Sequence, residues 1–499
     1  MKKMFLFVTL LFTVSLLFAQ DAEVNEHKEN LTGPFNSPQE VTKACLECHE
    51  EAGDEIIASR HWNWSEAPGT VPEGKVNLGK KNLINNFCIA VPSNYPRCTS
   101  CHIGYGWKDH NFDFTDSTKV DCLVCHDKTG TYEKFPSAAG YPVNKEKKFG
   151  KKTYSPPDYN YIAENVGNPD KHNCGSCHFV GGGGNNVKHG DIANEMNKIT
   201  KEIDVHMGID GANMDCIDCH KTEHHNISGN LYSIASSNTN RTTCEECHTE
   251  QPHENKILNS HTNKVACQTC HIPTYAKVSP TKMNWDWSTA GKFNEDGSVM
   301  IKKDSLGNMI YHSFKGTFVW ANNVKPEYKW FNGNAKHYLL GDIIDTSSAV
   351  EFNTLIGSYS DSASKIIPVK VHRGRQIYDA VNNYMILPHL YGKDSTSYWK
   401  NFNWDNAAKT GMESINLPYS GKYAFASTEM SWPINHMVAP RNESLSCEDC
   451  HSKNSRLSSL TDFYLPGRDQ NKTLDYLGFG LLIFAAFGIA IHSLLRLKK

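Results

Sequence analysis

Two apolar runs stand near the ends of this chain, and little regular hydrophobic periodicity lies between them. The first run, residues 4–19, follows two lysines and ends in a small residue before the polar, acidic stretch that begins at Gln20 and Asp21. This arrangement is typical of a secretory signal peptide, so the pattern predicts a signal over residues 1–19 with cleavage after Ala19. The rest of the chain is then exported to an oxidising, periplasm-type compartment.

The second apolar run covers residues 477–495 and is interrupted only by His492 and Ser493. Basic residues follow it: Arg496, Lys498 and Lys499. About 20 apolar residues cross the hydrocarbon core of a bilayer, so we predict one transmembrane anchor over residues 474–495. The positive-inside rule places the tail in the cytoplasm and the remainder outside, anchored to the inner membrane. A buried core helix is the alternative interpretation.

Between the two runs the pattern C-x-x-C-H recurs eight times. The copies are Cys45/Cys48/His49, Cys98/Cys101/His102, Cys122/Cys125/His126, Cys174/Cys177/His178, Cys216/Cys219/His220, Cys244/Cys247/His248, Cys267/Cys270/His271 and Cys447/Cys450/His451. In c-type haem attachment the two cysteines form thioethers and the histidine becomes an axial ligand of the iron.

Other uses of paired cysteines fit this pattern poorly. A zinc site does not require a histidine directly after every second cysteine, and a disulfide framework does not repeat one fixed spacing. We therefore predict eight covalently bound haem c groups, each with its iron. The mean hydropathy of −0.52 is low for a large exported domain. Eight buried porphyrins would supply the apolar core that side chains normally provide.

The spacing of the motifs predicts the organisation of the chain. Seven motifs crowd into a region over residues 20–271, a haem-free wrapping region follows over 272–446, and the eighth motif opens a segment over 447–470. The haem-free region is rich in Trp, Tyr, Asn and Gly and predicts loops, short helices and small strands. Because C-x-x-C-H commonly begins or lies on a short helix, we expect a mainly α fold with extensive irregular structure, built around stacked haems. The irregular motif spacing argues against a solenoid of identical repeats.

Low-spin electron-transfer haems need a second axial histidine, and a catalytic haem needs an exchangeable position. Seven histidines near the motifs are candidates for the second ligand: His61, His189, His206, His225, His253, His261 and His436. His224 competes with its neighbour His225, and His110 or His389 is a possible replacement. Seven candidates for eight haems favour one catalytic haem.

The flanks of the motifs resemble the octahaem tetrathionate reductase family of periplasmic cytochromes. The resemblance spans the exported part of the chain, including the isolated last motif. It rests on the strings Asn86-Phe87-Cys88-Ile89-Ala90, Cys98-Thr99-Ser100-Cys101-His102-Ile103-Gly104, Asp121-Cys122-Leu123-Val124-Cys125-His126-Asp127, Val187-Lys188-His189-Gly190-Asp191 and Trp432-Pro433-Ile434-Asn435-His436-Met437. It implies bis-histidine haems feeding one lysine-ligated haem that reduces tetrathionate, nitrite or hydroxylamine. The C-terminal apolar run departs from the soluble member of that family.

This resemblance points to the second motif as the catalytic haem, with Lys188 as its ligand; whether Lys188 replaces or complements His102 stays open. It also places Cys88, the seventeenth cysteine, near that haem, where a thiol would attack or hold a sulfur chain. Without the resemblance, burial is the ordinary role of such a cysteine. Arg97 and Lys108 add positive charge near the site for an anionic substrate. The glycines at 181–184 predict a tight chain reversal rather than a phosphate loop.

The balance of 51 basic and 54 acidic residues gives no argument for a nucleic-acid partner. Three functions remain open: a periplasmic terminal reductase of small oxidised sulfur or nitrogen species, a non-catalytic electron-transfer protein, and a hydroxylamine-type oxidase. One helix cannot build a multi-helix quinol site. We therefore expect a separate quinol-oxidising or cytochrome partner in the membrane.

Overall fold

The computed structural model describes residues 26–65, 77–230 and 239–497, and the chain divides into two units whose segments alternate along the sequence. The first unit comprises Met1–Asn63, Tyr95–Cys174 and Thr222–Ile227; the second comprises Trp64–Asn94, Gly175–Lys221 and Ser228–Lys499. The signal peptide predicted over residues 1–19 lies outside the described residues.

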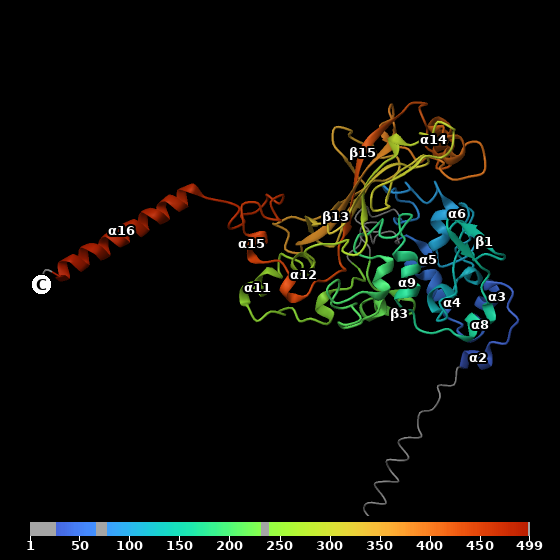
Figure 1. Ribbon diagram of the computed structural model, residues 1–499, viewed down its shortest axis with the longest axis horizontal. Coiled ribbons are helices and arrows are strands. Elements are labelled where there is room, and N and C mark those ends of the chain that lie inside the picture. The colour runs from blue at the N-terminus through green and yellow to red at the C-terminus, as the bar shows by residue number, and fades with distance from the viewer. Residues whose placement is uncertain (1–25, 66–76, 231–238, 498–499) are drawn as a thin grey trace, which may run out of the picture. The chain divides into compact units, whose positions relative to one another are not determined.

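Short helices dominate the first unit (Figure 1). They are α2 (Glu26–Asn30), α3 (Pro38–Cys48), α4 (Ala52–Ala58), α5 (Arg60–Asn63), α6 (Tyr95–Cys98), α7 (Leu123–His126) and α8 (Tyr159–Glu164), with the hairpins β1 (Lys147–Phe149)–β2 (Lys152–Tyr154) and β3 (Thr222–Glu223)–β4 (Asn226–Ile227). Helix α3 begins where Ser37 accepts a hydrogen bond from the Glu40 amide and Pro38 takes the first turn. The helix ends at Cys48, inside the first haem motif, so its N-cap fixes where that motif begins.

The haem motifs of the second unit lie on single helical turns. These turns are α10 (Cys216–Cys219), η4 (Cys244–Glu246), α12 (Cys267–His271) and α15 (Cys447–Cys450), with α9 (Lys171–His178) running from the first unit into the second and α11 (Lys256–His261) between motifs. Capping boxes start three of them. In α15 the Ser446 amide donates to Asp449 at 2.9 Å, and Asp215 and Asp218 are paired in the same way at α10. The acidic residue between the two cysteines therefore helps to form the turn that presents them.

A nine-stranded sheet fills most of the haem-free region. Its strands run in the order β11-β15-β13-β5-β8-β7-β6, with β9 and β14 also paired to β13. Their bounds are β5 Thr281–Asp286, β6 Ile301–Lys303, β7 Met309–His312, β8 Gly316–Ala321, β9 Glu327–Phe331, β11 Val350–Glu351, β13 Lys365–Asp379, β14 Tyr384–Met385 and β15 Tyr423–Pro433. Strands β10 (Ala335–His337) and β12 (Asn353–Leu355) form a separate pair, and α13 (Tyr398–Asn401) and α14 (Trp404–Glu413) are the helices of this region. The long antiparallel pair runs from Val369 opposite Pro433 to Asp379 opposite Tyr423.

The expectation of a mainly α fold is not confirmed, because the haem-free region is a sheet rather than loops with small strands. Its strands were hard to recognise because polar side chains occupy inward positions. On β13, Lys370, His372 and Gln376 are at most 1% exposed, and they interrupt the apolar alternation that marks a half-buried strand. The sheet packs a large aromatic cluster that includes Trp285, Trp287 and Trp432.

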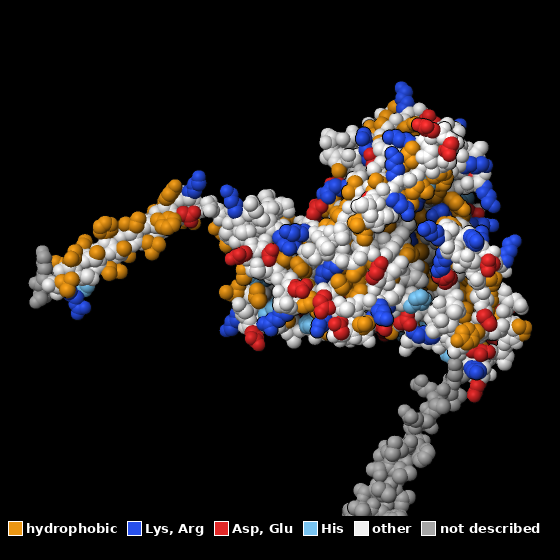
Figure 2. Space-filling view, in the orientation of Figure 1, with side chains coloured by type: hydrophobic (Ala, Val, Ile, Leu, Met, Phe, Trp, Pro, Cys, Tyr) orange, Lys and Arg blue, Asp and Glu red, His pale blue; other side chains and the backbone are white. Residues whose placement is uncertain are grey.

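Helix α16 (Lys472–Leu497) is the one helix in the described part of the chain that is long and apolar enough to cross a membrane. Its apolar window has a mean hydropathy of 2.1 and is not buried by the rest of the protein. Figure 2 shows apolar side chains along its visible surface. At a rise of about 1.5 Å per residue its length exceeds the roughly 30 Å of a hydrocarbon core.

Candidate haem sites and the Lys188 site

Pairs of histidine rings face one another at a separation that suits an iron between them. The five pairs and the distances between their ring centres are His27 and His49 at 6.3 Å, His206 and His248 at 6.0 Å, His220 and His436 at 6.4 Å, His253 and His271 at 6.1 Å, and His261 and His451 at 6.0 Å. Two imidazoles on opposite sides of one iron, with metal–nitrogen bonds of about 2.0 Å, have ring centres about 6.3 Å apart. In each pair one histidine belongs to a C-x-x-C-H motif. The residues present therefore fit bis-histidine haems.

Hydrogen bonds orient several of these rings through the same nitrogen. The motif histidines His126, His220 and His451 use Nδ1 with the carbonyl oxygens of Gly167 at 2.9 Å, Ser228 at 2.9 Å and Pro466 at 3.1 Å. Nδ1 of His261 likewise lies 2.8 Å from the Ile257 carbonyl oxygen, and Nδ1 of His436 lies 3.1 Å from Asp191. Such bonds fix the tautomer of a metal-binding histidine and leave Nε2 for the metal.

Four of the predicted second ligands, His206, His253, His261 and His436, are members of these pairs. His225 accounts for a further motif: burial lowers the pKa of His126, and the nearby charge of His225 lowers it further. His224 and His225 both hydrogen-bond Glu55, and the more exposed His224 exerts no such effect on His126.

The remaining candidates divide differently. His61 lies on α5 in the first unit, and His189 packs its ring 5.6 Å from that of Trp432 in the second. His389 is bound to Asp394 at 3.0 Å, and the structure pairs neither it nor His110 with a motif histidine. His27, which pairs with His49, was missed. It lies 18 residues before the first motif, close to the polar stretch after the signal, and only the fold of α2 brings it to His49.

Cys177 of the fourth motif differs from the equivalent thioether donor that the motif predicts. The division between the two units falls directly after Cys174, so the two cysteines of this one motif belong to different units. The Ser176 hydroxyl donates to Sγ of Cys177 at 3.7 Å, a contact that the motif pattern does not predict. Both cysteines nevertheless lie on α9 at a spacing of three residues, which places them on one face of that helix. This placement still suits attachment of both to one haem.

His248 of the sixth motif is exposed, whereas a ring held against a buried porphyrin is expected to be covered. The turn η4 ends at Glu246, two residues before His248, because a capping box between Thr243 and Glu246 sets a single short turn there. His248 therefore lies outside the helical turn that carries the first cysteine of its motif. Its ring still faces that of His206, and this pairing, rather than burial, is what fits His248 to an iron.

His102 differs from the other motif histidines. Its Nε2 lies 2.7 Å from the Trp62 carbonyl oxygen, so the nitrogen that elsewhere is left for the metal has a backbone partner. The ring is fully buried, with the ring centres of Trp62 at 4.8 Å, Trp107 at 5.0 Å and Phe112 at 5.5 Å. In this arrangement His102 is a member of an aromatic cluster.

The glycine run at 181–184 reverses the chain and is lined on two sides by predicted site residues. Gly182 and Gly183 have φ of +79° and +94°, and the Asn186 amide closes the turn on the Phe179 carbonyl at 2.9 Å. A Cβ on Gly181 would lie 3.2 Å from Cδ of Lys188, and one on Gly183 would lie 3.9 Å from Sγ of Cys88. Cys88 and Lys188 therefore contact the same short turn.

Lys370 of β13 anchors the backbone that carries Lys188. Its Nζ donates to the Val187 carbonyl at 2.7 Å, the Lys188 carbonyl at 3.1 Å and Oγ1 of Thr281 at 2.6 Å. Three acceptors satisfy all three N–H groups of an ammonium. Burial lowers the pKa of Lys370 well below its ordinary value, and the charge of Asp191 opposes that shift. The Nζ of Lys188 itself lies 4.6 Å from the Trp432 ring centre.

A second buried cation lies near Cys88. Lys282 of β5 is 5% exposed, with its Nζ 3.7 Å from the Phe318 ring centre and 4.0 Å from that of Trp285. Burial lowers the pKa of Lys282 well below its ordinary value, Lys315 lowers it further, and Cys88 raises it. The neighbouring His372 is fully buried, and within the described part of the chain neither of its ring nitrogens has a hydrogen-bond partner. Sequence reasoning missed Lys282, Lys370 and His372, because strand residues far from any motif carry no local signal of a site.

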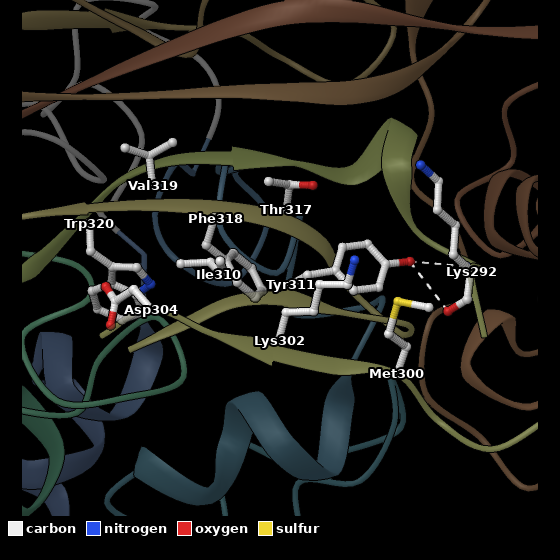
Figure 3. Close-up of a pocket in the computed structure, with 10 residues that line it drawn as sticks. All are labelled: Lys292, Met300, Lys302, Asp304, Ile310, Tyr311, Thr317, Phe318, Val319 and Trp320. Atoms are coloured by element: carbon white, nitrogen blue, oxygen red, sulfur yellow. Dashed lines mark hydrogen bonds between the residues drawn. The ribbon is translucent and has the colours of Figure 1, made fainter. Parts of the chain in front are cut away.

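An open pocket of about 520 Å³ lies over the strands β6–β8 (Figure 3). It is lined by Lys292, Met300, Lys302, Asp304, Ile310, Tyr311, Thr317, Phe318, Val319 and Trp320. The Tyr311 hydroxyl accepts from the Lys292 amide at 2.9 Å. The pocket contains no predicted site residue, but Phe318 in its wall also contacts the Lys282 ammonium.

Comparisons with known proteins agree with this interpretation of the sites. A family model described as cytochrome c554 and c-prime matches residues 44–127, and one described as bacterial cytochrome c matches residues 282–454. An uncharacterized protein of Archaeoglobus fulgidus is 26% identical over 260 residues, which is 42% of this chain and 83% of that protein. Together with the eight motifs and the paired histidines, these matches define a multihaem c-type cytochrome.

A solved structure identifies the family more closely. The octaheme cytochrome c of Shewanella oneidensis is 48% identical to this chain, with a TM-score of 0.79 over 87% of this chain and 96% of that one. The chain belongs to the octahaem cytochromes c, and its motif cysteines bind haem c covalently.

Proposed function

We propose that this protein is a terminal reductase of small oxidised sulfur or nitrogen species, with tetrathionate, nitrite and hydroxylamine as the substrate class. In this proposal Lys188 is the axial ligand of the haem attached at Cys98 and Cys101, and it replaces His102. When bound, that haem supplies electrons and an iron at which the substrate is held; the other haems have two histidine ligands.

The geometry of His102 carries the proposal. Three other motif histidines use Nδ1 for their backbone hydrogen bond, whereas His102 uses Nε2 with Trp62. Its burial among aromatic rings stabilises this position. A haem whose motif histidine is held in this way needs another ligand on that side of the iron. Adding His27 gives eight candidate second ligands, so the shortage of histidines no longer favours a catalytic haem, and the argument rests on His102.

The surroundings of Cys88 and Lys188 suit an anionic substrate. Lys282 and Lys370 bring two further amines into the buried interior of the same unit, and His372 adds an imidazole there. Burial, followed by the charges of Lys370 and Lys282, lowers the pKa of His372 well below its ordinary value. Neutral imidazole has one donor and one acceptor nitrogen, so His372 is able to pass a proton as well as to bind one. Nitrite and hydroxylamine both take up protons on reduction.

The test is the oxidised-state electron paramagnetic resonance spectrum of the haem-loaded protein and of Lys188→Ala. We expect one signal that is not bis-histidine in the parent protein. Lys188→Ala should change that signal alone and lower the rates of reduction of all three substrates by at least a hundredfold, since they share one iron. The exposed Lys198→Ala is the matched control and should change neither.

A parent spectrum composed only of bis-histidine signals, together with unchanged rates in Lys188→Ala, would contradict the proposal. It would favour a non-catalytic electron-transfer protein. A hydroxylamine oxidase would instead show oxidation of hydroxylamine with an added electron acceptor, lost in the same variant.

A further inference from the structure

We propose that residues 465–469 hold the eighth haem motif next to the membrane end of this chain, and that a membrane-embedded redox protein delivers electrons there. The proposal rests on the proposed function in one respect, the inward direction of electron flow. Its evidence is independent of Lys188 and Cys88.

Residues 465–469 fold back onto the eighth motif. Nδ1 of His451 lies 3.1 Å from the Pro466 carbonyl oxygen, which orients the ring toward its partner His261. Gly467 follows with a φ of +85°, and a Cβ at this position would lie 2.3 Å from the His451 carbonyl oxygen. Only glycine permits an approach this close, so the backbone of the segment lies directly against the motif.

Arg468 and Asp469 fasten the segment. The Arg468 guanidinium donates to the carbonyl oxygens of Leu457 at 3.3 Å and Phe463 at 2.6 Å, and to that of Leu460. It also pairs with Asp469 at 2.6 Å. Leu465 is 5% exposed and lies in an apolar cluster against which Cys450 of the motif packs. The segment is thus part of the folded unit up to Asp469.

Two residues separate this fastened segment from the apolar helix. After Gln470, Asn471 accepts a hydrogen bond from the Leu474 amide at 3.2 Å and so caps α16. Three residue steps span at most about 11 Å from Asp469 to Lys472. The five steps from Gly467, which contacts His451, span at most about 18 Å. If α16 lies in the bilayer, the eighth motif is held close to its surface.

The attachment sites of the second unit form a row that ends at this motif. The thiols of Cys244 and Cys267 hydrogen-bond one another, which joins the sixth motif to the seventh. Burial raises the pKa of Cys270 to about 11, and the charges of Cys450, Cys267 and Cys447 raise it further, so the seventh motif lies beside the eighth. Burial and then the charge of Cys247 raise the pKa of Cys219, which places the fifth motif beside the sixth. The eighth motif is one end of the row, and the membrane helix is attached at that end.

At this end each encounter transfers one electron. The donor iron passes from ferrous to ferric and the accepting iron of this chain from ferric to ferrous, without a change of bonds or protons. When the donor is recharged by a quinol, two electrons and two protons leave the quinol at the donor. A tether this short raises the effective concentration of any donor in the same bilayer.

The experiment lengthens the tether. Inserting 20 Gly/Ser residues after Gln470 adds a reach of about 25 Å. The same insertion after Gly297, whose Cβ position has no atom within 4 Å, is the control. Inside-out membrane vesicles from cells that produce the full haem-loaded chain receive NADH to reduce their quinone pool, and the haem absorbance of this protein records its reduction.

We expect the insertion after Gln470 to slow reduction at least fivefold, from the dilution of a flexible tether. The insertion after Gly297 should leave the rate unchanged, and dithionite should reduce all variants equally. Arg468→Gln, which loosens the segment without lengthening the chain, should also slow reduction. Equal rates in all variants, or equally fast reduction of the chain ending at Gln470, would overturn the proposal. Substrate takes no part in this assay, so its result is independent of whether Lys188 is catalytic.

Discussion

The ammonium of Lys370 donates to the carbonyl oxygen of Lys188 at 3.1 Å, so a fully buried lysine of the sheet holds the backbone of the proposed haem ligand. Replacing Lys370 with Met leaves the Val187 and Lys188 carbonyls and the Thr281 hydroxyl without this donor. Each buried unsatisfied group costs about 1–3 kcal/mol. We expect a free energy of unfolding lower by about 3 kcal/mol or more, measured by denaturant titration.

A positioning role for Lys370 requires more than lost stability. The signal of the lysine-ligated haem should broaden, and kcat should fall more than KM rises. Lys370→Gln, which keeps donors, should restore part of both. The surface variant Lys336→Met should change neither. A Lys370→Met protein with reduced stability but a normal spectrum and kcat would limit Lys370 to a structural role.

Cys88 distinguishes the sulfur substrate from the nitrogen substrates. The residue lies against Gly183, and its carbonyl accepts from Asn94 at 3.0 Å, ahead of a buried Ile89 with an unusual φ of 73°. If the thiol attacks or holds a sulfur chain, Cys88→Ser should lower tetrathionate reduction at least tenfold and leave nitrite reduction within about twofold. Cys88→Ala serves as the size control. Equal losses for both substrates would assign Cys88 to packing.

His27 should be the second ligand of the first haem. Its ring centre lies 6.3 Å from that of His49. Removal in His27→Ala should convert one haem to a high-spin form and shift its reduction potential, since axial-ligand identity sets both. The neighbouring Glu29→Ala is the control. An unchanged low-spin count, measured by electron paramagnetic resonance of the oxidised protein, would reject the pair.

These residues also show how far the sequence predicts the site. Haem attachment follows from a local motif, because the chemistry needs both cysteines and the histidine within five residues. Second ligands come from distant segments: His436 was recognisable from its flanks, whereas His27 has no motif beside it. The turn that brings Cys88 and Lys188 together was predictable from its glycines.

The motif does not predict the surroundings of its own members. His248 is exposed, whereas His102, at the same motif position, is fully buried. Cys177 accepts a hydrogen bond from the serine beside it, which the fixed motif positions leave unspecified. These differences arise from residues outside the motif positions, such as the capping box that ends η4 before His248.

The sheet was not predictable in the same way. Its central strand places buried Lys370 and His372 at inward positions, and a hydrophobicity pattern treats such residues as exposed. Their burial is favourable because of what surrounds them: Lys370 has three acceptors, which come from segments 89 to 183 residues away. No local pattern records those partners.

The mature chain should carry eight covalent haems. Every motif is complete, and the histidine of the second motif is kept even though Nε2 of His102 bonds Trp62. Intact-protein mass spectrometry should show eight haem additions. A His102→Ala variant should retain all eight if the thioethers alone hold that haem once formed. A mature mass with seven or fewer additions in the parent protein would contradict the motif count.

Two truncations should separate membrane attachment from haem binding. Ending the chain after Gln470 removes α16 and keeps residues 465–469, so we expect a protein that is recovered without detergent and retains every haem spectrum. Ending it after Tyr464 also removes the Pro466 carbonyl that orients His451, together with the Arg468 contacts. This shorter protein should leave the membrane equally well, but the eighth haem should lose its normal potential, because the ring of His451 is no longer fixed. Sedimentation of membranes reports the first property, and potentiometric titration of the haem absorbance reports the second. If the chain ending at Gln470 still sediments with membranes, α16 is not the anchor. If the two truncated proteins titrate identically, residues 465–469 do not control the eighth haem.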